Sequence, residues 1–233
     1  MFRARRICNK GRMVALACIL SPLLVAADVV DGATEAEPSG GDGLFPDRVS
    51  CRTGPFTINV NHDGPIAIKK NGGGEVTTSL ELARGATQVS IVKVWCASAG
   101  GDVILIYRAS YYGPSGEWIG GGVARLQAST GRTKWTAEVG GNAGPPLVEA
   151  RYAYVGGLGV IGKIDLDSGA YVWRHSGLAR VPGMYGAFGQ PRLDGRDVEF
   201  PAVHYNGGKP IPSEWPRAVR VNDRSGQIVE GQK

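Results

Sequence analysis

Three stretches of the chain share one pattern: RLQASTGRTKW (residues 125–135), KIDLDSGAYVW (residues 163–173) and RVNDRSGQIVE (residues 220–230). In each stretch an apolar residue stands second, a polar residue third, a hydroxyl residue sixth and Gly seventh, and the first two stretches end on Trp. A strand that ends at the polar residue, a turn with Gly at positive φ and a second strand make a β-hairpin. The pattern therefore predicts a repeated hairpin whose Trp ring covers a neighbouring unit.

Other short strands are expected between and before these hairpins. They are predicted at residues 65–70, 75–82, 89–95, 104–107, 146–155 and 191–203. A loop rich in Tyr, Gly and Pro is expected at residues 111–122. The first two repeat glycines, Gly131 and Gly169, are 38 residues apart, and short strands at such a period predict an all-β, β-propeller-like array.

The hairpins resemble the tryptophan-docking repeat of the pyrroloquinoline-quinone-type (quinoprotein) β-propellers, roughly Ala-Leu-Asp-x-x-Thr-Gly-x-x-x-Trp. The matched or replaced positions are Thr130, Gly131 and Trp135 in the first copy, Asp165, Gly169 and Trp173 in the second, and Asn222 and Gly226 in the third. Gln127 replaces the Asp of the first copy, and Glu230 replaces the Trp of the third. The resemblance covers about residues 103–232 and implies a propeller scaffold of four-stranded antiparallel sheets.

The resemblance raises the question of a cofactor. In the quinone-dependent dehydrogenases that carry this repeat, a much larger ring holds the quinone and Ca²⁺, often beside a disulfide of adjacent cysteines. This chain has no adjacent Cys pair and only 233 residues. We therefore expect the scaffold without a cofactor, without a metal and without catalytic residues.

The length of the repeat region bounds the number of blades. Residues 47–233 divided by about 40–45 residues per blade give about four blades, the lower end of the propeller range. A closed four-blade ring and an incomplete array, open at one edge or completed by another chain, both fit this length.

The N-terminus has the parts of an export signal. Five basic residues in the first 12 precede an uncharged apolar run at residues 13–27, with small residues at its end. Residues 1–27 are therefore predicted to be a signal peptide cleaved after Ala27. Residues 28–46 are acidic, rich in Gly and poor in apolar side chains, which predicts a disordered linker before the domain at residues 47–233.

Cysteine usage agrees with export. Two of the four cysteines, Cys8 and Cys18, lie in the predicted signal peptide, so the mature chain keeps Cys51 and Cys96. One pair in a secreted or periplasmic protein predicts one disulfide. Two buried free thiols are the alternative.

The net charge of +5 is not evidence for nucleic-acid binding. The signal peptide holds five of the 26 Lys and Arg residues and no acid, so the remaining chain has 21 basic and 21 acidic residues. Bases and acids are interleaved along the domain. We therefore expect no nucleic-acid partner, and the single short apolar run also predicts that the protein is not an integral membrane protein.

Two further motifs have simple structural interpretations. GLGVIGK (residues 157–163) matches glycine-rich nucleotide-binding patterns, but the strand-forming sequence after it lacks the helix that such sites need, which favours a tight turn. Asp165 and Asp167 could hold Ca²⁺, although capping of the turn by Asp165 is the more ordinary role.

Aromatic residues offer a recognition surface. Tyr111, Tyr112 and Trp118 fall in the expected loop, and loops on a rigid all-β scaffold often carry binding. Burial of these rings between blades is the other interpretation.

The sequence thus favours a non-catalytic binding or scaffold module that engages another envelope or extracellular protein. A carbohydrate-binding protein or enzyme that uses residues 107–118 is the alternative. A third hypothesis is an accessory subunit whose open sheet edge pairs with a partner. The oligomeric state is left open.

Overall fold

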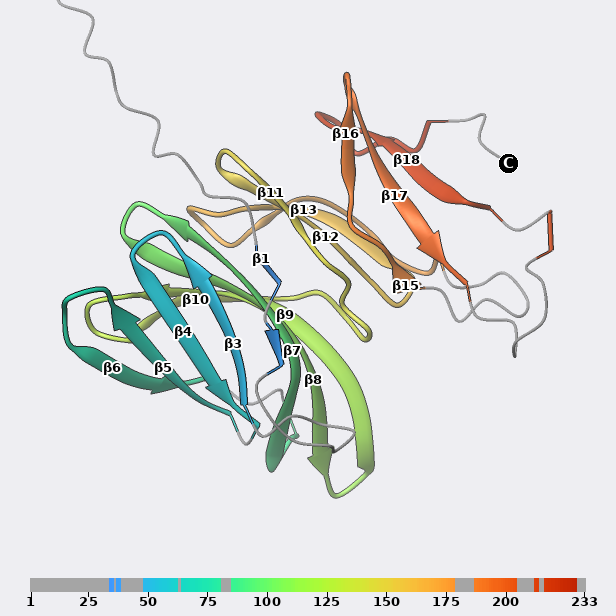
Figure 1. The fold of residues 1–233 in the computed structure, drawn as a ribbon. Helices are drawn as coiled ribbons and strands as arrows, with labels where there is room; N and C mark the ends of the chain where they lie inside the picture. The colour runs from blue at the N-terminus through green and yellow to red at the C-terminus, as the bar shows by residue number, and fades with distance from the viewer. Residues whose placement is uncertain are drawn as a thin grey trace, which may run out of the picture.

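The computed structural model describes residues 34–35, 37–38, 48–62, 64–80, 85–178, 187–204, 212–213 and 216–229. Every regular element in this part of the chain is a β-strand, and none of it forms a helix with the length and apolar character needed to cross a membrane. The strands form four antiparallel sheets, here called sheets I to IV, which follow one another from lower left to upper right in Figure 1. The predicted all-β array of about four sheets is confirmed.

Sheets I and II lie at the N-terminal end of the array. Sheet I contains, in spatial order, β2 (Glu37–Pro38), β3 (Arg48–Thr53), β4 (Phe56–Asn61), β5 (Pro65–Lys70) and β6 (Glu75–Ser79). Sheet II contains, in spatial order, β1 (Thr34–Glu35), β7 (Gln88–Ala99), β8 (Asp102–Gly113), β9 (Gly116–Gln127) and β10 (Thr133–Glu138). In both sheets four successive strands form an up-and-down meander, which is the topology of a propeller blade.

Sheets III and IV continue the array. Sheet III contains β11 (Leu147–Glu149), β12 (Tyr152–Gly157), β13 (Val160–Asp165) and β14 (Tyr171–His175) in that order. Sheet IV contains β15 (Ala187–Phe188), β16 (Arg192–Asp194), β17 (Asp197–Val203) and β18 (Ala218–Asn222), with β17 paired to the other three. An isolated bridge from Val221 to Ile228 begins a further neighbour of β18.

Three hydrophobic cores join the four sheets face to face. The core between sheets I and II includes Ile58 and Leu105, the next includes Ile104 and Ile164, and the last includes Ile161 and Phe200. All six side chains are fully buried. Removal of this apolar surface from water holds the sheets together.

Burial on both faces explains the continuous apolar run in β8. Val103 and Leu105 face sheet I, whereas Ile104 and Ile106 on the opposite face meet sheet III. The strand therefore lacks the alternation of apolar and polar residues that a strand with one solvated face shows.

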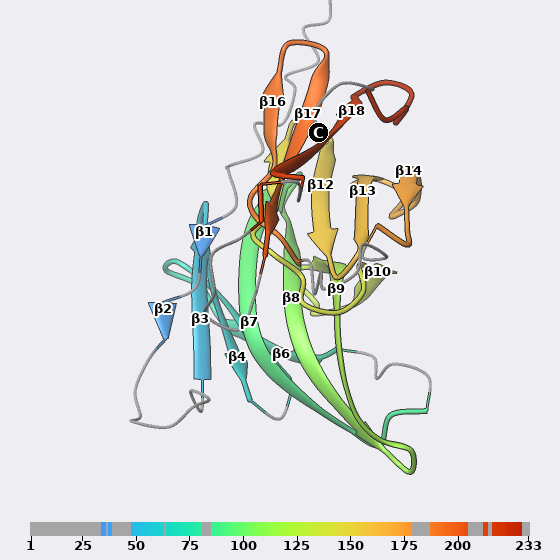
Figure 2. The ribbon, with the colours of Figure 1, turned by 90° about the vertical axis from the view of Figure 1, so that its right-hand side faces the viewer.

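The two end sheets have polar outward faces. Arg52 and Lys69 are exposed on sheet I, and Arg192 and Asp194 are exposed on sheet IV. Figures 1 and 2 place these sheets at opposite ends of the molecule. The array is therefore an open one rather than a closed ring, and its ends are capped by polar surface as in other repeat proteins.

Two short strands lie within residues 28–46, which the composition predicts to be a disordered linker. β1 pairs with β7, and β2 pairs with β3. These four residues supply hydrogen-bond partners to strands that would otherwise have an open edge, and the linker over residues 28–46 stays a prediction. The predicted signal peptide and the rest of the linker lie outside the described residues.

The loop predicted at residues 111–122 is wrong. β8 and β9 pair from Asp102 opposite Gln127 to Gly113 opposite Gly116, so the segment is the tip of a long hairpin. A Cβ on Gly120 would stand 2.5 Å from the Tyr111 ring. The glycines that suggested a loop instead make room for tyrosine rings that lie across the strand pair.

The predicted disulfide joins Cys51 of β3 to Cys96 of β7. The two Cα atoms are 6.1 Å apart, and both residues are buried in the core between sheets I and II. The bond links the first two sheets across 45 residues of chain.

We predict that replacing both Cys51 and Cys96 by Ala lowers the free energy of unfolding by about 3–4 kcal/mol, because the unfolded chain regains the entropy of a loop of this length. Urea unfolding of the variant and of the oxidised wild type measures the difference. A loss below about 1 kcal/mol would contradict the prediction.

Candidate functional site

The tryptophan of the first repeat docks on the turn of the second. Trp135 on β10 donates its indole N–H to the carbonyl oxygen of Leu166, with 3.1 Å between the two heavy atoms. Its ring covers Gly169, where a Cβ would stand 2.5 Å from Cδ2 of the indole. Gly169 has φ +74, so the turn needs glycine both for its backbone conformation and for the space under the ring.

The tryptophan of the second repeat docks in the same way on the third. Trp173 on β14 donates its indole N–H to the carbonyl oxygen of Asp223 at 2.9 Å. Its ring covers Gly226, which has φ +70. The tryptophan-docking repeat inferred from the sequence is thus present at both junctions. Glu230, which replaces the third Trp, lies outside the described residues.

At each of these two junctions a cation also contacts the carbonyl on which the tryptophan docks. The repeat pattern alone did not predict this contact. Arg125 Nη1 donates to the Leu166 carbonyl at 2.8 Å, and Lys163 Nζ lies 3.4 Å from the Asp223 carbonyl oxygen. Both cations stand first in their repeat, and both carbonyls belong to the fourth residue of the next repeat. All three repeats begin with a basic residue, and this shared feature could have predicted the contact.

The junction between sheets III and IV also holds a partly buried ion pair. Lys163, with 5% of its surface exposed, donates to Asp223 Oδ1 at 2.8 Å and stands 4.1 Å from the centroid of the Tyr152 ring. Tyr154 donates its hydroxyl to the same carboxylate oxygen at 2.7 Å. Burial and the bond to Asp223 raise the pKa of Tyr154 far above its ordinary value. These groups act as structural partners across the junction.

The third residue of each repeat caps its own turn. Thr130 donates its hydroxyl to Gln127 Oε1 at 2.9 Å, and Ser225 donates its backbone N–H to Asn222 Oδ1 at 3.0 Å. Asp165 Oδ1 accepts the backbone N–H groups of Asp167 and Ser168, each at 3.0 Å. Capping is therefore the observed role of Asp165, and the described residues hold no cluster of three or more potential metal ligands.

The charge of Asp165 is paired with Arg151. Arg151 donates from Nε and Nη2 to Asp165 Oδ2. Burial pushes the pKa of the Asp165 carboxyl up, but the hydrogen bonds from Arg151, Ser168 and Asp167 outweigh it, so the pKa lies below its ordinary value.

The three aromatic residues proposed for recognition lie on the β8–β9 hairpin. Tyr111 stands opposite Trp118, and their rings stack with centroids 5.8 Å apart. Tyr111 is 5% exposed and Trp118 packs against the same core, so burial raises the pKa of Tyr111. Tyr112 is half-buried opposite Glu117. Two of the three rings are therefore anchored in the core.

The hairpin instead presents a free backbone edge. It reaches beyond the other sheets at the bottom of Figures 1 and 2. β10 pairs with β9 only from Gly122 to Leu126, and the segment after β10 lies beside Gly121 and Ile119, so the stretch that no described strand or printed hydrogen bond covers on this side is Gly116 to Trp118. Gly121 accepts a hydrogen bond from Val139 on this side, so alternation along the strand directs the N–H of Glu117 to the free edge.

Two exposed apolar side chains flank this edge. Ile119 is 45% exposed and Leu158, in the turn between β12 and β13, is 38% exposed. Gly141 lies between them, near the Ile119 carbonyl and the Leu158 Cβ. The edge and the two side chains form one surface, here called the β9 edge.

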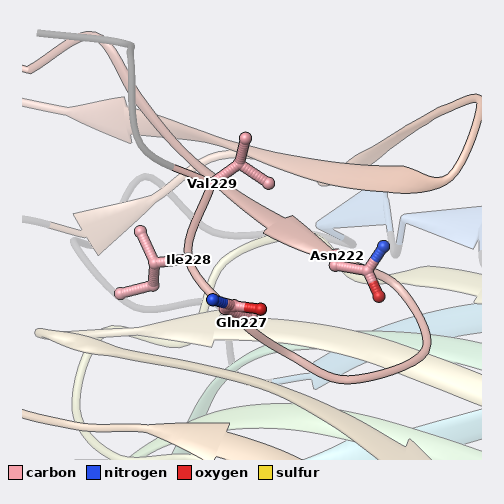
Figure 3. Close-up of a pocket in the computed structure, with 4 residues that line it drawn as sticks. All are labelled: Asn222, Gln227, Ile228 and Val229. Carbon is pink, nitrogen blue, oxygen red and sulfur yellow. The ribbon is translucent and has the colours of Figure 1, made fainter.

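A pocket of about 360 Å³ lies beside the third repeat turn (Figure 3). It is lined by Asn222, Gln227, Ile228 and Val229. The capping bonds from Ser225 already occupy Asn222 Oδ1, and the two aliphatic side chains are 42% and 41% exposed. The pocket therefore has a mixed lining of two amide and two aliphatic side chains at the last described edge of sheet IV.

Comparison with known proteins supplies no family. No protein-family model and no curated protein matches the chain. Among solved structures the chain is similar to BamB from Moraxella catarrhalis, with 14% identity and a TM-score of 0.48 over 86% of this chain and 66% of that one. It is also similar to apo AztD from Citrobacter koseri, with 14% identity and a TM-score of 0.37 over 83% of this chain and 50% of that one.

A protein of unknown function from Bacteroides caccae is a further match, with 10% identity and a TM-score of 0.29 over 85% of this chain and 92% of that one. This chain thus spans 66% of the length of BamB and half of the length of AztD. At these identities the similarity concerns the fold alone.

Two glycine substitutions isolate the docking contact. Gly226→Ala and Gly72→Ala both place Ala at φ near +70, but only the Cβ at 226 meets a Trp ring, because nothing lies within 4 Å of the Cβ at 72. We predict a loss of about 1–2 kcal/mol for Gly72→Ala, from the left-handed backbone alone. Gly226→Ala adds about 1–3 kcal/mol for displacement of the ring. Equal losses of unfolding free energy in the two variants, measured by urea unfolding, would contradict the docking of the Trp173 ring on Gly226.

The lowered pKa of Asp165 predicts a pH dependence. A carboxyl whose pKa is lower in the folded state stabilises the fold above its unfolded pKa, and this contribution disappears as the pH falls through the folded pKa. Asp165→Asn should therefore cost about 1 kcal/mol or less at pH 7, and the difference from wild type should begin to shrink below about pH 4 and disappear once the pH lies below the folded pKa.

The same urea series on Asp167→Asn is the comparison, because Asp167 is exposed and pairs with Arg125 and Arg151 but accepts none of the turn N–H groups that Asp165 caps. A difference for Asp165→Asn that persists unchanged at pH 3 would exclude the ion pair as its cause.

Proposed function

We propose that the chain is a non-catalytic binding module of an oxidising compartment outside the cytoplasm, secreted or periplasmic, and that it engages another protein through the β9 edge. The observation that carries the proposal is the unpaired stretch of β9 at the tip of the longest hairpin. Unpaired N–H and C=O groups in extended conformation are a template for an added strand. The partner supplies that strand as an extended segment.

The exposed side chains support docking at this edge. Ile119 and Leu158 offer apolar contact next to the backbone groups, as strand-addition sites do when pockets for side chains accompany main-chain pairing. Sheet IV also exposes apolar side chains, including Leu193 and Ile228, so the proposal rests on the combination of apolar side chains with free backbone groups at the β9 edge.

The compartment follows from the cysteines and the predicted signal peptide. A buried disulfide between sheets I and II persists in oxidising surroundings such as the periplasm or the cell exterior. The basic and apolar N-terminal segment supplies the export signal that such a location needs.

The carbohydrate-binding or enzymatic alternative at residues 107–118 requires open aromatic faces. The Tyr111 ring is buried and stacked on Trp118, so this pair supports the hairpin rather than a sugar platform. The geometry favours protein binding.

Glu117→Pro tests the proposal, with Glu117→Ala as the matched control. Both substitutions remove the carboxylate, but only Pro removes the N–H that faces the free edge, and Pro is tolerated on the open side of edge strands. A photoreactive residue at position 119 of the full-length protein, in the cells that produce it, reports the partner by crosslinking. A second photoreactive residue at Val172, which is 47% exposed on β14, is the positional control.

We expect one dominant protein crosslinked from position 119, unchanged by Glu117→Ala and reduced at least tenfold by Glu117→Pro, with no such product from position 172. Thermal unfolding confirms that both variants fold. Equal crosslinking by the two variants would exclude strand addition at this edge, and absence of any protein crosslink from position 119 would exclude the site.

A further inference from the structure

A cavity of about 490 Å³ lies where β7 and β8 of sheet II approach β15 of sheet IV. Its walls come from β7, β8, β15, the end of β17 and the segment before β11, and include Lys93, Trp95, Arg108, Pro145, Phe188 and Val203. These residues are far apart in sequence. The cavity exists only because the array stacks its sheets in order.

Two cations face each other across the β7–β8 pair in the wall of this cavity. Lys93 and Arg108 are direct register partners, and the register shifts between Ile91 and Lys93, which marks a β-bulge. Lys93 also lies over the Trp95 ring, with its Nζ 5.6 Å from the ring centroid. Bulges commonly re-aim side chains at binding sites. None of the described residues that line the cavity is acidic.

Two buried donors in the same wall have no acceptor within the described part of the chain. Trp95 is 2% exposed, and its indole Nε1 has no hydrogen-bond partner; Arg108 Nε is likewise buried and unpartnered. Buried N–H groups in folded proteins nearly always find an acceptor, since an unmade bond carries the full cost of desolvation. The contrast with Trp135 and Trp173, whose indole groups are both bonded, singles out Trp95.

The other residues that line the cavity indicate what kind of ligand it would hold. Pro145, Phe188 and Val203 contribute apolar surface to the same cavity. A ligand that matches both the donors and the apolar residues of the lining therefore has an anionic group that accepts hydrogen bonds and an apolar body. A carboxylate fits the charged end, because its two oxygens can accept from the guanidinium and the indole together.

We propose that this cavity binds a small organic carboxylate with an apolar body, held by Arg108, Lys93 and the Trp95 indole N–H. The site goes beyond the proposed protein-binding function and does not involve the free backbone groups of β9.

Calorimetric titration of the full-length oxidised protein with phenylacetate tests the site. Phenylacetamide, which has the same shape without the charge, and inorganic phosphate, which has charge without the apolar body, are the comparison probes. We expect saturable binding of phenylacetate, and binding of phenylacetamide and phosphate at least tenfold weaker. Equal binding of either comparison probe would overturn the assigned ligand class.

Two variants test the two donors separately. Trp95→Phe removes the indole N–H but keeps an aromatic ring in the core, and Arg108→Gln removes the charge. Each should weaken phenylacetate binding at least tenfold, whereas Arg192→Gln, on the exposed strand β16, should leave it unchanged. Wild-type affinity in either folded cavity variant would overturn the site. If Arg108→Gln does not fold, the phenylacetate affinity of Trp95→Phe alone tests the site.

Discussion

One backbone carbonyl in the second and in the third repeat turn receives two donors from the preceding sheet, and the order of sheets II to IV depends on these contacts. At the junction of sheets II and III the Leu166 carbonyl receives the Trp135 indole N–H and the Arg125 guanidinium. At the junction of sheets III and IV the Asp223 carbonyl receives the Trp173 indole N–H, with the Lys163 ammonium at longer range. Apolar burial supplies most of the attraction between sheets, but it has no direction. The paired donors fix which turn meets which strand, and hence the relative placement of successive sheets.

This placement has consequences at a distance from the junctions. Sheet II is buried on both faces, so β8 and β9 can extend as a long hairpin whose base is held firmly while its tip stands clear of the other sheets. The same stacking brings Lys93 and Arg108 into a cavity with Phe188 of sheet IV. The free edge and the cavity thus both depend on the same stacked arrangement of sheets.

Much of this architecture could be predicted from local signals. The Gly and Trp of each repeat, the capping residue before the Gly and the even pair Cys51 and Cys96 act through short-range or pairwise chemistry, and the structure bears out the hairpins, the capping and the disulfide. The loop at residues 111–122 was predicted wrongly because glycine was taken as a turn signal, although Gly120 instead lies under the Tyr111 ring. The cavity could not be foreseen, since Lys93 and Arg108 become opposite only after a bulge shifts the register.

The exchange of the indole N–H protons with deuterium tests the central claim most directly. Nitrogen-15 labelling of tryptophan, with assignment by single Trp→Phe variants, resolves each indole in the folded protein. We predict that the indoles of Trp135 and Trp173 exchange slowly and at one common rate set by global unfolding, because both are hydrogen-bonded at sheet junctions. Exchange of either one as fast as the half-buried indole of Trp118 would contradict the docking of successive sheets through these bonds.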